Sequence, residues 1–274
     1  MYERFYLLDR MPFENTPDPA FLHLAGDHRE ILAALAGGIA SGKTWLLLTG
    51  DAGAGKTTLV QALLGELEEN LLVIPVPYPQ AGFEGIVHAL SHHLSLHFID
   101  RSNPADTHAK LGFRLAQVHK GGKRAVLIID EAHLLDETGL AELRRFSDRV
   151  NEDRTLLQIV LSGQPEILET LRKGAAPGMA GRIDPACELR PMGKTAVEAY
   201  VRHRLAIAGR TKPLFEPKAL NLIWEKSGGV PRVVNLLCDT ALLIGYARGL
   251  RRIDSGVVER AADSLETGRP AVCP

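Results

Sequence analysis

Two stretches of this sequence carry the spacing G-x-x-x-x-G-K-T, at residues 37–44 and 50–57. In a loop of this kind, glycines let backbone N–H groups surround a phosphate, the lysine reaches its oxygens, and the hydroxyl after the lysine can hold Mg²⁺. Such a loop follows a buried strand and opens a helix, whose positive end faces the anion. One nucleotide cannot occupy both copies, so the flanking residues must decide between them.

The flanks favour the second copy. "TWLLLTG" (44–50) is a short apolar run typical of a buried strand, and 57–69 has helical apolar spacing. The first copy has the reverse order, because it follows a helical pattern and runs into the strand. There Gly37 and Gly38 indicate a helix end, and Lys43 is predicted to be a solvated turn residue.

We therefore predict that ATP or GTP binds at Lys56. The predicted nucleotide-binding residues are Gly50, Asp51, Ala52, Gly53, Ala54, Gly55, Lys56, Thr57 and Thr58.

Polar side chains also follow two further apolar runs. In "VLIIDEAH", Asp130 and Glu131 end a predicted strand, at the edge where open parallel sheets bind ligands. We expect Asp130 to orient Mg²⁺ together with Thr57, and Glu131 to polarise the water that attacks the γ-phosphate. Gln164 ends the next strand and could detect the γ-phosphate as an uncharged sensor, with Ser162 as the alternative position.

Two arginines are candidates for contact with the transferred phosphate. Arg182 precedes a short apolar segment and could complete the site of a neighbouring subunit; the alternative is an exposed arginine paired with Asp184. Arg232 follows the Gly228-Gly229 turn, with Pro231 suited to a first helical turn. From that helix start it could close on the γ-phosphate, so that a nucleotide would change the angle between two domains.

Alternating short strands and helices predict an α/β fold, with a parallel sheet covered on both faces. From about residue 193 the strands stop and four helical patterns follow. The change of period places a domain boundary near 190–194.

Composition limits the other possibilities. With 32 Lys+Arg, 33 Asp+Glu and a net charge of −1, bulk charge gives no reason to expect a nucleic-acid binder, and the basic clusters at 144–149 and 247–252 are interpreted as solvated faces. The sequence has no apolar run of the ~18–20 residues that a membrane span needs and no signal peptide, so we expect a cytoplasmic protein without a transmembrane segment. The cysteines are interpreted as reduced thiols, and the histidine pairs as polar-face residues without a third zinc ligand. These residues are Cys187, Cys238 and Cys273, and His88/His92 and His93/His97.

Taken together, these motifs resemble the AAA+ ATPases of the general secretion pathway protein A (ExeA-like) family. The resemblance begins at "FYLLDRMPFENTPDPAFLHLAGDHREIL" (5–32) and continues through "LLTGDAGAGKTTL", "VLIIDEAHLL", "LQIVLSGQPE", "YVRHRLAIAG" and "SGGVPRVVNLLCDTALL". The ordered set is specific, although GKT and DEAH-like strings are individually widespread. The core also resembles transposition-regulator (TniB-like) AAA+ ATPases.

The resemblance implies a P-loop AAA+ core, three-layered around its parallel sheet, with a helical lid, and ATP with Mg²⁺. The expected domains are an N-terminal segment packing on the nucleotide site (1–35), the core (36–192), the lid (193–268) and a tail (269–274). The implied roles are Walker A for Lys56 and Thr57, Walker B for Asp130 and Glu131, first sensor for Gln164, arginine finger for Arg182, second sensor for Arg232, and adenine proximity for His28. The segment before Arg182 lacks the Gln-Arg usual in the family.

The expected function is ATP hydrolysis that rotates the lid against the core, in a homo-oligomer with active sites between subunits. The work served would be assembly of an envelope, secretion or pilus-type apparatus, with protein partners of that system. Two alternatives stay open: a DNA-associated ATPase of the transposition-regulator kind, and a nucleotide-switched adaptor with little turnover.

Overall fold

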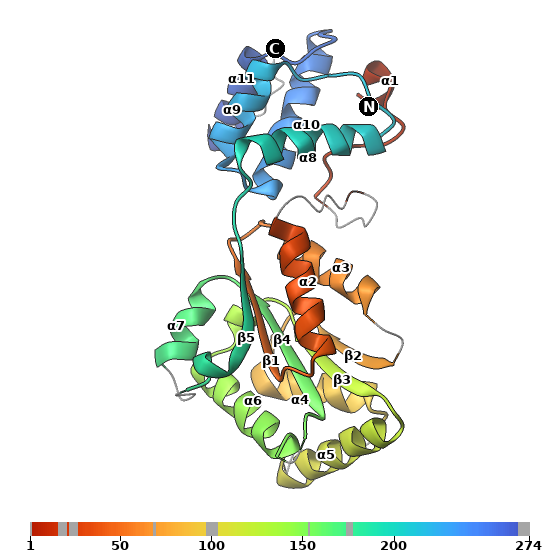
Figure 1. Ribbon diagram of the computed structural model, residues 1–274. Coiled ribbons are helices and arrows are strands. Elements are labelled where there is room, and N and C mark those ends of the chain that lie inside the picture. The colour runs from red at the N-terminus through yellow and green to blue at the C-terminus, as the bar shows by residue number, and fades with distance from the viewer. Residues whose placement is uncertain are drawn as a thin grey trace. The chain divides into compact units, whose positions relative to one another are not determined.

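The structure is a computed structural model that describes residues 2–15, 21, 27–67, 70–96, 104–152, 154–173 and 178–267. It contains two compact units, shown in Figure 1. The sheet unit comprises Arg29–Asp51 and Leu59–Leu189, and the helical unit comprises Met1–His28, Ala52–Thr58 and Arg190–Pro274. The predicted tail at 269–274, Cys273, His97, and residues 16–20 and 22–26 of the N-terminal stretch lie outside the described residues.

Five parallel strands form the sheet, in the order β2-β3-β4-β1-β5. They are β1 (Trp45–Gly50), β2 (Leu71–Val76), β3 (Arg124–Ile129), β4 (Leu157–Gly163) and β5 (Ile183–Leu189). Every residue of β1 and β4 is buried, because interior parallel strands are covered on both faces. The outer strands β2 and β5 are partly exposed and contain Pro75 and Pro185, since an edge strand tolerates a missing N–H.

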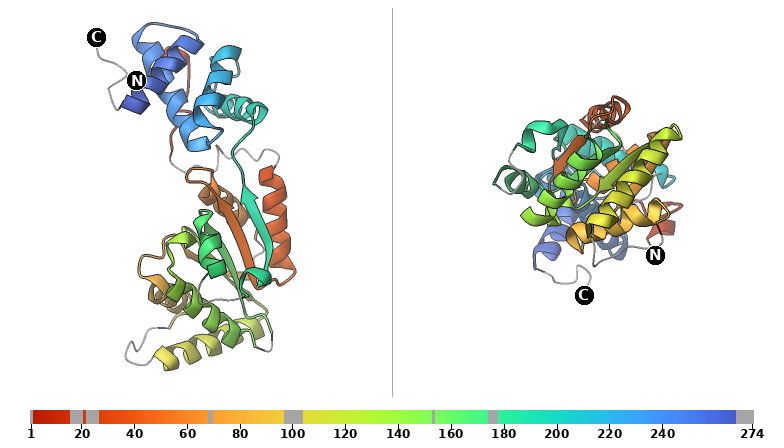
Figure 2. Two further views of the ribbon diagram at one scale, coloured as in Figure 1. Left: turned by 90° about the vertical axis from the view of Figure 1, so that its left-hand side faces the viewer. Right: turned by 90° about the horizontal axis from the view of Figure 1, so that it is seen from below.

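Helices cover both faces of this sheet (Figures 1 and 2). The helices that lie wholly or mostly in the sheet unit are α2 (Asp27–Ala40), α3 (Lys56–Glu66), α4 (Gly82–His93), α5 (Pro104–Lys120), α6 (Glu137–Val150) and α7 (Glu166–Lys173), with the short turns η2 (Ala132–Leu134) and η3 (Ala180–Arg182). Leu47, Leu127 and Ile159 point to one face and share a core with α4, α5, α6 and α7. On the other face α2 approaches so closely that a Cβ on Gly38 would lie 2.7 Å from Leu46 Cδ2. The predicted three-layer α/β fold is confirmed.

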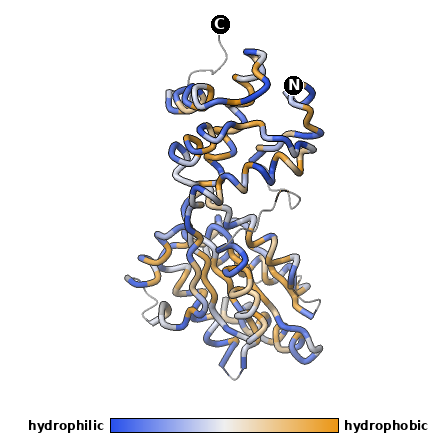
Figure 3. The backbone as a smooth tube through the Cα atoms, turned by 45° about the horizontal axis from the view of Figure 1, so that its top comes forward, coloured by the Kyte–Doolittle hydropathy of each residue, from blue (hydrophilic) through white to orange (hydrophobic). Residues whose placement is uncertain are grey.

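The helical unit contains α1 (Glu3–Tyr6), α8 (Lys194–Ile207), α9 (Pro217–Ser227), α10 (Pro231–Ala247) and α11 (Ser255–Thr267). These helices alternate hydrophilic and hydrophobic stretches in Figure 3, as expected for amphipathic helices around a shared core. Pro217 and Pro231 stand at the starts of α9 and α10, where no intrahelical N–H is lost. Of the helices in the described ranges, none is long and apolar enough to cross a membrane.

The first residues of the chain belong to the core of the helical unit. Tyr2, Tyr6 and Phe13 are each at most 2% exposed within that core. The Tyr2 hydroxyl donates a hydrogen bond to the Asp239 carboxylate in α10. Gly245 leaves room for Tyr6, because a Cβ there would lie 2.5 Å from the Tyr6 hydroxyl. The segment expected at 1–35 is therefore divided, with its first residues in the helical unit and Arg29 onward in the sheet unit.

Candidate nucleotide-binding site

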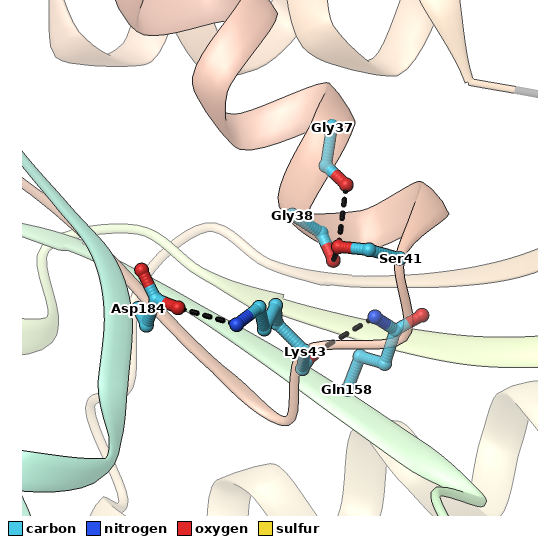
Figure 4. Close-up of polar contacts among 6 residues, drawn as sticks. All are labelled: Gly37, Gly38, Ser41, Lys43, Gln158 and Asp184. Carbon is cyan, nitrogen blue, oxygen red and sulfur yellow. Dashed lines mark hydrogen bonds and ion pairs between the residues drawn. The ribbon is translucent and has the colours of Figure 1, made fainter.

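The first G-x-x-x-x-G-K-T copy lies at the C-terminal end of α2, as Figure 4 shows. Its helix ends at Ala40, and the Ser41 hydroxyl donates to the Gly37 carbonyl at 2.7 Å. Lys43 pairs with Asp184 at 2.5 Å, and both side chains are about half exposed or more. The negative end of a helix, with carbonyls directed outward, disfavours a phosphate.

Side chains from the sheet also occupy this turn. Arg124 donates to the carbonyls of Ile39 and Ala40, and the Gln158 amide donates to those of Ile39 and Lys43. The helix extends through Gly37 and Gly38, beyond the end expected from the sequence, because the missing side chain of Gly38 permits contact with Leu46 and Pro185. This first copy joins a helix to a strand.

The second copy begins at the opposite edge of the sheet, where β1 ends. Gly53 and Gly55 have φ angles of 79° and 104°, which residues with a side chain rarely adopt. Lys56 opens α3 and is only 6% exposed, whereas Thr57 is exposed. Gly50 has a different reason to lack a side chain, since a Cβ there would lie 2.6 Å from the Leu189 carbonyl oxygen of β5. The local geometry is that of a phosphate-binding loop at a helix start.

The loop contacts the first turn of α10 within the helical unit. The Arg232 N–H donates to the Gly53 carbonyl at 3.3 Å. A Cβ on Gly53 would lie 2.7 Å from the Arg232 Cβ, so only glycine fits at this position. The Arg232 side chain is exposed. Arg232 and the loop are therefore neighbours.

Asp130 and Glu131 follow β3 at the carboxyl edge of the sheet, the edge at which β1 also ends. Asp130 is 7% exposed, and its Oδ1 accepts from the Ser162 hydroxyl at 2.7 Å and from the Glu131 N–H at 3.0 Å. Ser162, in the adjacent strand β4, thus fixes the orientation of the Asp130 carboxylate. Glu131 has a φ of 51°, an unfavourable backbone conformation for a side-chain-bearing residue and one that is concentrated at functional sites.

Gln164 follows β4 and is half-buried beside His133 of η2. The Gln164 Nε2 and His133 Nε2 atoms lie 2.9 Å apart, and His133 Nδ1 lies 3.4 Å from Glu131 Oε2. Sequence reasoning missed His133. The available signal was its place three residues after Asp130 in "DEAH", on the turn that leaves the strand.

The structure places Arg182 away from these residues, in η3 before the first residue of β5. Its guanidinium pairs with Asp148 of α6 at 2.6 Å. The alternative pairing with Asp184 is wrong, because Lys43 holds that carboxylate. Since β5 runs parallel to β1, Arg182 lies at the amino edge of the sheet. A finger role for Arg182 would therefore require the site of another subunit.

His28, expected near the adenine, is the second residue of α2 and is half-buried. Among the described residues there is no group of three or more His, Cys, Asp or Glu side chains that could hold a metal ion. Cys187 and Cys238 are free thiols, and burial raises the pKa of both.

Comparisons with known proteins concern the family and the fold. Residues 39–171 match the AAA domain family. Over 267 residues, 96% of this chain, the sequence is 36% identical to general secretion pathway protein A of Aeromonas hydrophila, of which the match covers 48%. The chain thus spans about half the length of that relative.

Two solved structures have a similar fold. The Aeropyrum pernix ORC2 protein, in ADPNP–ADP complexes, gives a TM-score of 0.68 at 16% identity, covering 93% of this chain and 71% of that one. The Drosophila origin recognition complex bound to DNA gives 0.67 at 16% identity, covering 97% of this chain and 66% of that one. At this identity the similarity concerns the fold alone.

Proposed function

We propose that this chain, which belongs to the AAA+ ATPase family, binds ATP at residues 50–58 and hydrolyses it to ADP and phosphate. The observation that carries the proposal is the loop at the start of α3. Gly53 and Gly55 adopt positive φ angles, and Lys56 follows them at the helix start. Together these residues offer backbone N–H groups, a helix dipole and one cation to a polyphosphate.

The other residues of the carboxyl edge suit hydrolysis. The Ser162 hydroxyl holds the Asp130 carboxylate in a fixed orientation, so Asp130 can orient a ligand with little reorganisation. Glu131 is the proposed general base that polarises the attacking water, and Gln164 is the proposed sensor of the γ-phosphate. Arg232 is the proposed second sensor, because its backbone already contacts Gly53.

The residues available also fit Mg²⁺. Thr57 and Asp130 supply a hydroxyl and a carboxylate, and Mg²⁺ is bound by oxygen atoms, usually through one or two protein groups together with substrate phosphates. The bound ion would neutralise charge on the phosphates. Because so few protein ligands are needed, a preformed cluster of acidic residues is not required.

We propose that hydrolysis serves assembly of an envelope or secretion apparatus on the cytoplasmic side, where ATP is available. The proposal rests on the similarity to general secretion pathway protein A. We further propose a homo-oligomer in which Arg182 reaches a neighbour's nucleotide, since this side chain lies at the sheet edge opposite Asp130. Two arginines of the basic clusters at 144–149 and 247–252, which a DNA-binding role would use, have contacts of their own: Arg144 with Asp148, and Arg251 with Phe5.

The test is steady-state phosphate release by the wild type and by Glu131→Gln. Loss of a general base lowers turnover by about 10²–10⁴-fold, and ATP binding should persist because Lys56 is unchanged. The matched control is Glu152→Gln, which removes an exposed carboxylate after α6 and should have wild-type turnover.

The outcomes separate the competing functions. Negligible release by the wild type, with intact ATP binding, would favour the nucleotide-switched adaptor. Equal turnover in the wild type and Glu131→Gln would rule out the proposed water activation. Sedimentation of Glu131→Gln with ATP tests the oligomer, which should be larger than with ADP.

A further inference from the structure

His133 links two residues to which the proposed function gives separate tasks. Its ring lies between Glu131 and Gln164, with the Nδ1 edge 3.4 Å from Glu131 Oε2 and the Nε2 edge 2.9 Å from the Gln164 side-chain nitrogen. The His133 side chain is 13% exposed and that of Glu131 is 35% exposed. The ring is thus mostly enclosed but still in contact with water.

The backbone holds this arrangement in place. Gly163, the last residue of β4, lets η2 pack against the strand, because a Cβ there would lie 2.9 Å from the His133 N atom. The positive φ of Glu131 turns the chain from β3 into η2. The Gln164 N–H lies 3.4 Å from His133 Nδ1, so both the backbone and the side chain of Gln164 face the ring.

A neutral imidazole has one N–H donor and one acceptor nitrogen, and a glutamine amide has both kinds of group. When the Gln164 nitrogen donates to His133 Nε2, the ring proton is on Nδ1, which lies 3.4 Å from Glu131 Oε2. When the Gln164 amide is rotated by about 180°, its oxygen faces the ring and accepts a hydrogen bond from a proton on His133 Nε2. Nδ1 then carries a lone pair, accepts from the Gln164 N–H, and no longer donates to Glu131.

We propose that His133 is a positioning residue that transmits the state of Gln164 to Glu131. This proposal rests on the proposed function. Without a γ-phosphate, the Nδ1 proton restrains Glu131. A γ-phosphate oxygen accepts the Gln164 amide protons and turns the amide oxygen toward His133. The ring gives its Nδ1 proton to water and takes one from water at Nε2, so its charge is unchanged. Glu131 is released to polarise the attacking water.

The decisive experiment is a double-mutant cycle on ATP turnover. Gln164→Ala should be slow, partly because nothing then turns the His133 ring and Glu131 stays restrained. Adding His133→Ala removes the restraint, so Gln164→Ala/His133→Ala should hydrolyse ATP about 10- to 100-fold faster than Gln164→Ala, the effect of losing one hydrogen bond to a charged group. A role of His133 in packing alone would make the double variant slower.

Two further variants sharpen the test. His133→Asn keeps an amide near the Nδ1 position, so in the Gln164→Ala background it should remain slow. His119→Ala, on α5 away from these residues, is the matched control and should give no rescue. Binding of a fluorescent ATP analogue should be equal in all variants, which separates turnover from affinity.

The two proposals fail differently. If the wild type hydrolyses ATP, Glu131→Gln does not, and the double variant is no faster than Gln164→Ala, the coupling through His133 is overturned while the ATPase stands. The coupling is also overturned if Gln164→Ala turns over like the wild type. Wild-type turnover in Glu131→Gln overturns the proposed function itself.

Discussion

Replacing Ser162 by alanine should destabilise the sheet unit through the loss of one hydrogen bond. The Ser162 hydroxyl is fully buried and donates at 2.7 Å to Asp130, which is itself 7% exposed. A hydrogen bond to a charged group contributes about 1.5–3 kcal/mol, and Ser162→Ala removes one such bond from a buried carboxylate. In Ser162→Ala, the Glu131 N–H would still donate a hydrogen bond to the same Asp130 oxygen.

The chain provides a matched control in Ser91. This serine is also buried, at 1% exposure, but its hydroxyl has no hydrogen-bond partner among the described residues. Ser91→Ala therefore removes the same atom without breaking a bond, and the free energy of unfolding should stay the same or rise slightly. The difference between the two variants isolates the contribution of the Ser162–Asp130 bond.

The assay is urea unfolding followed by tryptophan fluorescence. Trp45 is 2% exposed in β1, so in a Trp224→Phe background it reports on the sheet unit alone. In thermal unfolding followed by the same fluorescence, a loss of 1.5–3 kcal/mol corresponds to a fall in melting temperature of about 3–12 °C for a domain of about 150 residues. Equal stability of both serine variants would refute the reasoning. Ser162→Ala should also need about tenfold more Mg²⁺ for half-maximal ATP turnover, because Asp130 is less well oriented.

Three further predictions address the loop and the helical unit. Lys56→Ala should abolish binding of a fluorescent ATP analogue. Lys43→Ala should bind it normally, because the Lys43 side chain pairs with an exposed acid. Equal loss of binding in both variants would contradict the assignment of the nucleotide site to residues 50–58. Arg232→Ala keeps the backbone bond to the loop, so ATP binding should persist while phosphate release falls about 10²–10³-fold, as for removal of one preorganised donor; an unchanged rate would restrict this arginine to packing. Tyr2→Phe should lower the stability of the helical unit by about 1–3 kcal/mol at pH 7, measured by Trp224 fluorescence. Burial raises the pKa of Asp239 above 3.8 while the Tyr2 bond lowers it. A raised native pKa gives a contribution that is complete below the unfolded value and lost as pH rises through the native value. Because Tyr2 favours the carboxylate, the deficit of Tyr2→Phe should shrink as the pH falls through the native pKa; a deficit that does not change with pH would contradict this assignment.

Local patterns were sufficient for the strands and for the order of strand and helix around each G-x-x-x-x-G-K-T copy. The runs around Leu47 and Leu127 are short, apolar and followed by turn residues, so burial on both faces could be predicted without knowing their neighbours. The loop at Lys56 could be separated from its copy by the order of strand and helix alone, because a phosphate needs the N-terminal end of a helix.

Other features depend on contacts between distant parts of the chain. Ser162 was an alternative sensor in the sequence, but its bond to Asp130 follows from the adjacency of β3 and β4. Arg182 and Asp148 are 34 residues apart in the sequence. From the sequence alone, the nearby Asp184 was therefore the expected partner of Arg182. His133 was missed because its partners come from two strand ends that the sequence does not align.

The burial of Tyr2 against Asp239 has a consequence for how the chain is made. These two residues are separated by 237 positions, and the whole sheet unit lies between them in sequence. During synthesis, the first aromatic side chains leave the ribosome long before α10 exists, whereas domains generally fold as they emerge. The sheet unit can therefore fold before α10, against which Tyr2 packs, has been synthesised. Closure of the helical unit must therefore follow the synthesis of α10, and a chain truncated before α10 would leave Tyr2, Tyr6 and Phe13 without the core that buries them.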